Sequence, residues 1–322
     1  MLHTPPRKPR RARAFGMFLL VVLLAFAGFG IWVDQTLDRA PVLTDYPGRP
    51  AAGKGTTWLL VGSDNRDDLG PDQQVELATG GDMDSARTDT IILVHVPALG
   101  SSRSTAMVSI PRDSYVPVPG YGQDKINAAF AIGGPRLLVQ AVEGATGIRV
   151  DHYAELGFGG FANVVDAMGG VPMCLSEPMD DPLAGISLSA GCQKLDGRNA
   201  LGFVRSRATP RADLDRMVHQ REFMSALLRR ATDPRVSLDP VRWVRVEKAF
   251  TDAMTVDSGA HVWDLARLAW ALRGSTVATT VPIAGFVTND SGDVVSWDQE
   301  AASRLFKAMA ADEALPDDTL QS

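Results

Sequence analysis

The sequence lacks the residue patterns on which several common enzyme classes depend. It contains two cysteines and five histidines, and no set of them has the spacing of a zinc site. It has no Gly-x-Ser-x-Gly nucleophile elbow and no Gly-x-x-x-x-Gly-Lys-Ser/Thr phosphate-binding loop. Internal repeats and low-complexity segments are absent as well. These absences argue against zinc enzymes, esterases of the nucleophile-elbow type and P-loop nucleotidases.

Beyond the first 13 residues, negative charge exceeds positive charge. Five arginines and lysines precede the first acidic residue, and the formal net charge of the chain is −6, so subtracting these five charges leaves −11 for the rest. A globular region that acidic is a poor candidate for general nucleic-acid binding. We therefore predict no nucleic-acid partner.

Long hydrophobic runs are also rare, and the single one covers residues 15–33. This run is just long enough to span a bilayer as a helix. The basic residues within 1–14 predict a cytoplasmic tail, which places the rest of the chain outside the cell membrane. Ala25-Phe26-Ala27 resembles a signal-peptidase site, so a cleaved signal peptide is the alternative. The run continues through Ile31 and Trp32, which favours an uncleaved single-pass anchor.

The remainder of the chain predicts one domain. Residues 34–56 are rich in Pro, Gly and Ala and indicate an extracytoplasmic linker, followed by a domain over 57–315 and a tail over 316–322. Strands alternate with helices, which predicts an α/β fold: a central mixed, largely antiparallel sheet flanked by helices in three layers. Outside the membrane, Cys174 and Cys192 are expected to form a disulfide, with two free buried thiols as the alternative.

Three runs rich in β-branched residues begin this domain, at 57–61, 90–96 and 103–110. Turn-forming residues 97–102 connect the second and third runs as in a hairpin. In an antiparallel meander, the end of the first strand, the start of the second and the end of the third share one edge of the sheet. Charged side chains would gather at that edge: Asp64, Arg66, Arg87, Asp89, Arg112 and Asp113.

Carboxylates beside guanidiniums are suited to holding a divalent cation together with a phosphate. Surface ion pairs at strand ends are the alternative interpretation. Lys125 and Asn127 begin a later helix and could reach the same anion, although a solvated face is the more common position for such residues. A second basic group surrounds the helix predicted over 213–230, where Arg216 and Gln220 share one face. This group is either a second basic wall of the site or a solvated helix face.

Several motifs occur in a fixed order over residues 57–230. They are Leu-Leu-Val-Gly-Ser-Asp-Asn-Arg, Ala-Arg-Thr-Asp-Thr-Ile, Ser-Ile-Pro-Arg-Asp, Lys-Ile-Asn, and Arg-Ser-Arg followed by Asp-Leu-Asp-Arg-x-x-His-Gln. This succession resembles the LytR-CpsA-Psr family. The resemblance implies a phosphotransferase that moves a glycopolymer from a polyprenyl-diphosphate carrier onto peptidoglycan through a phosphodiester, with Mg²⁺ or Mn²⁺ as cofactor.

Two other functions stay open, a polyprenyl-diphosphate pyrophosphatase and an envelope sensor or transcriptional attenuator. Teichoic acid, capsule and arabinogalactan are all possible glycopolymers. The cysteine pair and the Ala- and Arg-rich composition resemble actinobacterial members of the family, and this resemblance would favour arabinogalactan.

The resemblance also implies roles for individual residues. Asp64 and Asp89 correspond to the carboxylates of the metal site, and Asp89 or Asp113 would orient or deprotonate the acceptor hydroxyl. Arg112 would act in catalysis. The sequence departs from the family pattern at Asp215 and His219, where relatives often have Gly and Arg. The implied pyrophosphate-binding set is Arg87, Arg112, Lys125, Arg205, Arg207, Arg216 and Gln220.

Overall fold

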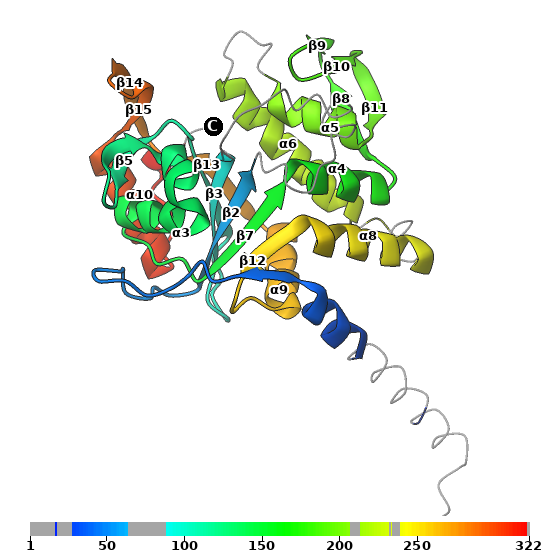
Figure 1. Cartoon of the computed structure of the whole chain (residues 1–322), viewed down its shortest axis with the longest axis horizontal. Helices are drawn as coiled ribbons and strands as arrows, with labels where there is room; N and C mark the ends of the chain where they lie inside the picture. Colours follow the sequence, from blue (N-terminus) through cyan, green and yellow to red (C-terminus); the bar gives the residue numbers. More distant parts are fainter. Residues whose placement is uncertain are drawn as a thin grey trace, which may run out of the picture.

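The computed structural model describes residues 28–63, 88–206, 213–231 and 239–320, together with Met17 and Asp233. Its centre is a seven-stranded sheet with the strand order β1-β12-β7-β2-β3-β4-β13 (Figure 1). The strands are β1 (Asp38–Ala40), β12 (Met254–Asp257), β7 (His152–Gly157), β2 (Thr56–Ser63), β3 (Thr88–Val96), β4 (Thr105–Ile110) and β13 (Thr276–Thr280).

The sheet is mixed, as predicted, but it is not largely antiparallel. Within this described sheet, β1–β12, β7–β2 and β4–β13 pair in parallel, whereas β12–β7, β2–β3 and β3–β4 pair antiparallel. Strands joined by a tight turn pair antiparallel, whereas parallel partners need a long crossover. The three parallel pairings join strands far apart in sequence, which local patterns do not reveal.

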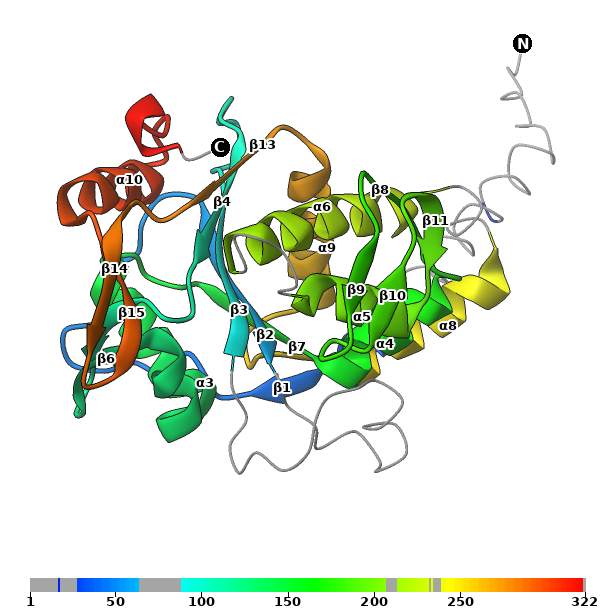
Figure 2. The ribbon, with the colours of Figure 1, turned by 90° about the horizontal axis from the view of Figure 1, so that it is seen from above.

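Helices cover both faces of the sheet and give the predicted three layers (Figure 2). Helices α3 (Ile126–Thr146) and α10 (Gln299–Ala311) pack on one face, against side chains that include Leu59 and Leu93. Helix α9 (Val262–Arg273) packs on the other face, against Trp58 and Val94. Adjacent strand positions face opposite layers, as the pleat of a strand requires.

The three predicted strands form the antiparallel meander β2–β3–β4. Ser63 at the end of β2 pairs with Thr88 at the start of β3, and Ile110 at the end of β4 pairs with Ile91. The last residue of β7, Gly157, also pairs with Ser63. We call this end of the sheet, where β2, β4 and β7 end and β3 begins, the rim.

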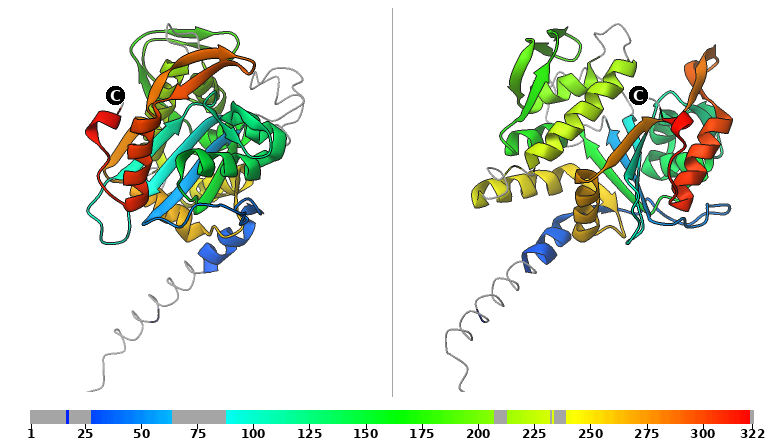
Figure 3. Two further views of the ribbon diagram at one scale, coloured as in Figure 1. Left: turned by 90° about the vertical axis from the view of Figure 1, so that its left-hand side faces the viewer. Right: turned by 180° about the vertical axis from the view of Figure 1, so that it is seen from behind.

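A second apolar cluster forms a lobe on one side of the sheet (Figure 3, right). Its helices are α4 (Phe158–Ala167), α5 (Gly197–Arg205) and α6 (Asp213–Ala231), and α8 (Pro240–Ala253) packs against α4. Two small hairpins complete the lobe, β8 (Val171–Leu175) with β11 (Gly191–Leu195) and β9 (Met179–Asp181) with β10 (Ile186–Leu188).

A disulfide joins Cys174 of β8 to Cys192 of β11. Replacing both cysteines by serine is expected to lower the free energy of unfolding by about 3 kcal/mol, because the cross-link closes a loop with a sequence separation of 18. Urea denaturation of the variant and of the reduced wild type measures this, and the two should agree. A loss below about 1 kcal/mol in both samples would contradict the prediction.

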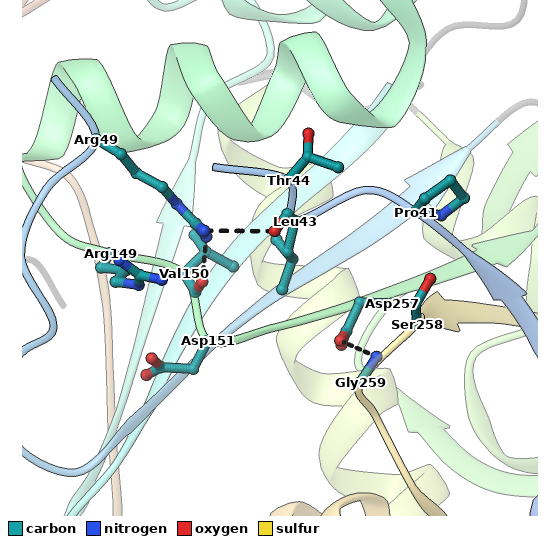
Figure 4. Close-up of a pocket in the computed structure, with 10 residues that line it drawn as sticks. All are labelled: Pro41, Leu43, Thr44, Arg49, Arg149, Val150, Asp151, Asp257, Ser258 and Gly259. Carbon is teal, nitrogen blue, oxygen red and sulfur yellow. Dashed lines mark hydrogen bonds between the residues drawn. The ribbon is translucent and has the colours of Figure 1, made fainter. Parts of the chain in front are cut away.

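Residues 34–56, predicted as a linker, are part of the folded domain. Strand β1 completes one edge of the sheet, and the Lys54 amide donates to the Ala310 carbonyl. The Arg49 guanidinium donates to the carbonyl oxygens of Leu43 and Val150, as Figure 4 shows. The abundance of Pro, Gly and Ala therefore indicates a segment of irregular structure that packs against the domain, not a linker detached from it.

The two chain ends complete the description. Residues 28–36 are helical, and in the part of the chain that is described no helix has both the length and the apolar character needed to cross a bilayer. The tail 1–14 and most of the predicted span 15–33 lie outside that part. The predicted tail 316–322 is not free over its described residues, because η1 (Asp317–Thr319) buries Thr319 and Arg304 pairs with Asp318.

Candidate functional site

A bulge interrupts the pairing of β2 and β3 at the rim. Gly62 pairs with Thr90 and Ser63 pairs with Thr88, so Asp89 is the extra residue of β3. A Cβ on residue 62 would lie 3.1 Å from the Cβ of Thr90, which explains the glycine. Bulges redirect side chains and are common beside active sites. The backbone thus places Asp89 at the rim, although its side chain lies outside the described residues.

Two buried hydroxyls form the floor of the rim beside this bulge. Ser63 and Thr88 are both 0% exposed, and they face each other across β2 and β3. Among the described residues, neither hydroxyl oxygen has a hydrogen-bond partner. A buried hydroxyl without a partner costs about 1–3 kcal/mol. The floor of the rim therefore contains two buried polar atoms whose hydrogen-bonding capacity is unused among the described residues.

A cluster of two cations and a carboxylate stands on the β4 side of the rim. Arg112 Nε donates to Asp113 Oδ2 at 3.3 Å, and Lys125 Nζ lies 3.1 Å from Asp113 Oδ1. All three side chains are partly exposed, so their polar atoms remain accessible to an anion. Asp113 bonds both cations and so holds them on the same side of the site.

The backbone of this cluster is fixed by its neighbours. The carbonyl of Arg112 accepts from the Asn127 amide, that of Asp113 from the Val295 amide, and that of Ser114 from the Ile126 amide. Val295 belongs to β15 (Gly292–Trp297), which forms a hairpin with β14 (Ile283–Asn289). Three consecutive carbonyls are thus bound by α3 and β15. Arg112 and Asp113 project from a rigid turn, which is the arrangement that charge recognition favours.

A second basic group faces the rim from the lobe. Arg205, the last residue of α5, lies with its guanidinium 4.8 Å from the ring centre of Phe158, the residue that follows β7. The Gln220 amide of α6 donates to the Val204 carbonyl, and the Ser206 hydroxyl donates to Asp181. These contacts hold the end of α5 at the β7 side of the rim.

Helix α3, which begins directly after Lys125, and helix α5, which ends at Arg205, lie on opposite sides of β2 and β3 (Figure 2). In the sheet, β3 and β2 lie between β4 and β7, so three strand spacings separate the ends of β4 and β7. At about 4.8 Å each, these spacings amount to about 14 Å between the backbones. Arginine side chains from both sides can reach a phosphate group placed between them, and guanidinium groups bind phosphate oxygens in pairs.

The structure thus gathers some of the predicted site residues and leaves others undescribed. Arg112, Asp113 and Lys125 meet directly, and in the lobe Gln220 donates to the carbonyl of Val204, the residue before Arg205. Asp64, Arg66, Arg87 and Arg207 lie outside the described residues. For Asp89 and Arg216 the backbone is described, in β3 and α6 respectively, and the side chain is not.

The sequence interpretation missed Ser63 and Thr88, although each immediately precedes a predicted metal ligand. Within the described residues there is no group of three or more side chains from His, Cys, Asp and Glu that could hold a metal ion. The oxygen atoms on the floor are nevertheless of the hard type that Mg²⁺ prefers. The predicted ligands Asp64 and Asp89 have their side chains outside the described residues, so the magnesium site stays a prediction.

The fold and the rim define a class of protein: a three-layer α/β domain that carries a partly exposed cluster of Arg112, Asp113 and Lys125 where β4 ends. Comparison with known proteins gives the family. The model of the LytR_cpsA_psr family matches residues 38–311, and the chain belongs to this family.

Individual relatives agree with this assignment. The chain is 51% identical over 297 residues to "Probable cell wall biosynthesis protein LcpB" of Corynebacterium glutamicum, covering 92% of this chain and 69% of that protein. Two solved structures share the fold. The LytR-Csp2A-Psr enzyme from Actinomyces oris has a TM-score of 0.64 at 24% identity, covering 85% of this chain and 96% of that one. TagT bound to LI-WTA has a TM-score of 0.59 at 24% identity, covering 84% and 94%.

Proposed function

We propose that this protein is an extracytoplasmic phosphotransferase anchored in the cell membrane by residues 15–33. It would move a glycopolymer from a polyprenyl-diphosphate carrier onto peptidoglycan through a phosphodiester bond. The observation that carries the proposal is the rim itself, where two basic groups flank a floor of unsatisfied hydroxyls. The likeness to LcpB, named for cell wall biosynthesis, and to TagT, solved with LI-WTA, supports the same class of function.

The rim residues would act mainly by positioning and charge neutralisation, which dominate phosphoryl transfer. Arg112 and Lys125 on one side and Arg205 on the other would bind the diphosphate. The acceptor hydroxyl oxygen would attack the phosphorus that carries the glycan, and the bridging P–O bond would break to release polyprenyl phosphate. The proton of the hydroxyl would pass to Asp89 or Asp113. The other proposed ligands of the diphosphate are Arg87, Arg207, Arg216 and Gln220.

Asp64 and Asp89 would hold Mg²⁺, or Mn²⁺, beside the hydroxyls of Ser63 and Thr88. Asp64 directly follows Ser63 in the sequence, and Asp89 directly follows Thr88. A divalent ion bound there would draw electrons from the phosphate oxygens. Asp113 already bonds Arg112 and Lys125, so its contribution includes orienting both cations.

A product assay tests the proposal and separates it from the hydrolytic alternative. The full chain in detergent is incubated with a polyprenyl-diphosphate-linked glycan and peptidoglycan, with and without Mg²⁺. Transfer predicts glycan coupled to peptidoglycan by a phosphodiester and release of polyprenyl phosphate. A pyrophosphatase would give free phosphorylated glycan instead. Failure to convert the donor at all would contradict both enzymatic functions and favour a sensor.

The buried hydroxyl of Thr88 provides a specific test of the floor. Thr88→Val keeps the shape of the side chain and removes the hydroxyl, so we expect unchanged or slightly higher stability, because a buried unsatisfied group is lost. Transfer should fall by about tenfold, the equivalent of one hydrogen bond to a charged ligand. The measurements are a urea denaturation midpoint and the rate as a function of Mg²⁺ concentration.

Thr105→Val is the matched control for this variant. Thr105 is also buried in the central sheet, but its hydroxyl donates to the Ala271 carbonyl at the edge opposite the rim. Its loss should lower stability by about 1 kcal/mol and leave the rate unchanged. Equal transfer rates for Thr88→Val and the wild type would show that the floor does not contact the ligand.

A further inference from the structure

Helix α9 carries an unusual exposed stripe. Trp263 is 55% exposed and Trp270 is 75% exposed, and Arg267 lies exposed between them. Residues at i, i+4 and i+7 share one face of a helix. The other face of α9 places Leu265 and Leu268 in the core. Large aromatic side chains on a soluble surface are uncommon, and a stripe of them indicates a contact surface.

This helix lies near the end of the sheet that is opposite the rim. It begins shortly after β12 ends, and β12 runs antiparallel to β7, whose far end is at the rim. The Thr105 hydroxyl, at the start of β4, donates to the Ala271 carbonyl. Arg267 donates to the carbonyl of Pro97, just after β3 ends. Both ends of α9 are therefore on the side of the domain that faces away from the rim.

The start of α9 is bonded to the residue that follows the predicted membrane span. The Asp34 carboxylate accepts from the Val262 amide at 2.9 Å and lies 3.1 Å from His261 Nδ1. Arg39 pairs with Asp34 at 2.9 Å and donates to the Ala260 carbonyl. The side chains of Val33 and Leu37 are buried. No free stalk separates residue 33 from the domain within this described segment.

Trp263 is held close to this junction. Its ring stacks on that of His261 with 4.3 Å between the ring centres. Since His261 contacts Asp34, the Trp263 ring lies beside the end of the predicted span, where the headgroup region of a bilayer begins. Trp is enriched in that region, where its ring meets acyl chains and its N–H meets water.

We propose that α9 rests on the membrane surface, with Trp263, Arg267 and Trp270 among the phospholipid headgroups. The proposal rests on the anchor at residues 15–33, which forms part of the proposed function. A lipid surface is the occupant because the chain itself brings the bilayer to the start of α9. Arg273 lies 5.7 Å from the Trp270 ring and adds a second positive charge for anionic headgroups.

Fluorescence quenching by lipids tests this contact. The full chain is reconstituted into vesicles that contain phospholipids brominated near the headgroup end of their acyl chains. Lipid-dependent quenching of tryptophan emission should decrease in Trp263→Phe and in Trp270→Phe. Trp297→Phe is the control, because Trp297 is buried and its indole N–H donates to Ser114 near the rim. This control should leave lipid-dependent quenching unchanged.

Two negative outcomes can be told apart through Trp32, which lies within the predicted span. If Trp32→Phe reduces quenching while Trp263→Phe and Trp270→Phe do not, the anchor is present and the proposed contact of α9 is wrong. If none of the three variants changes the quenching, the anchor itself is contradicted, and the proposal fails with it.

Discussion

Replacing Arg112 by alanine is expected to lower the rate of glycan transfer by about 100-fold or more, because in the proposed function Arg112 stabilises the charge of the transferring phosphoryl. The structure gives a reason for so large an effect. The Arg112 turn is fixed through three consecutive carbonyls, so a neighbouring side chain cannot easily move into its place. Arg112→Lys should retain part of the rate, since lysine keeps the charge but not the paired donors of a guanidinium.

Measurements of stability and a matched arginine variant show whether the lower transfer rate comes from a lost catalytic role or from a damaged fold. Arg112 pairs with Asp113 at a partly exposed position, so its removal should change the free energy of unfolding by less than about 1 kcal/mol. Arg103→Ala makes the same change of charge in the exposed turn between β3 and β4, at the opposite edge of the sheet. A rate for Arg112→Ala within threefold of that of Arg103→Ala would remove Arg112 from the proposed mechanism.

Replacing Glu143 by alanine is expected to destabilise the domain by about 3–5 kcal/mol, because a buried charge then loses its partner. The Glu143 side chain is 0% exposed and accepts from Tyr46 at 2.8 Å, from Arg49 Nε at 3.1 Å and from the Val150 amide at 2.9 Å. The Arg49 side chain is only 6% exposed. Burial, together with the hydrogen bond to Glu143, raises the pKa of Tyr46 well above its ordinary value, so its hydroxyl stays protonated.

Asp45 offers the matched control for this ion pair. It also pairs with Arg49, at 3.0 Å, but its side chain is 81% exposed. Asp45→Ala should therefore cost less than about 1 kcal/mol. Urea denaturation of both variants gives the comparison. Similar small losses for both would mean that residues 43–50 do not contribute to the fold and that the linker interpretation was right.

Local patterns were sufficient for the part of the fold that forms the rim. Alternation and turn residues predicted the β2–β3–β4 meander and placed Arg112 and Asp113 at its edge. The Gly133-Gly134 pair marks a break within α3, where both residues have non-helical backbone angles. Such features depend on residues close in sequence, and short-range rules capture them.

Other features depend on contacts that no local pattern encodes. The bulge that leaves Asp89 as the extra residue of β3 arises from the register of β2 against β3, not from either strand alone. The hairpin β14–β15 braces Asp113 from a segment near residue 295. Residues 34–56 have the composition of a linker, but the ion pair between Arg49 and Glu143 fixes this segment to the domain. In each case, the physical cause is a partner far along the chain.

The strand order also has a consequence for how the chain must fold during synthesis. Strand β1 pairs with β12, so residue 38 lies beside residue 255. Strand β4 pairs with β13, so residue 105 lies beside residue 276. One outer strand, β13, is translated late, and the other, β1, is translated early but has no partner until β12 has been made. Sheets closed by such distant pairs fold slowly, and their open strand edges are prone to aggregation in the meantime. The first half of the chain therefore keeps unpaired strand edges until about residue 280 has been synthesised.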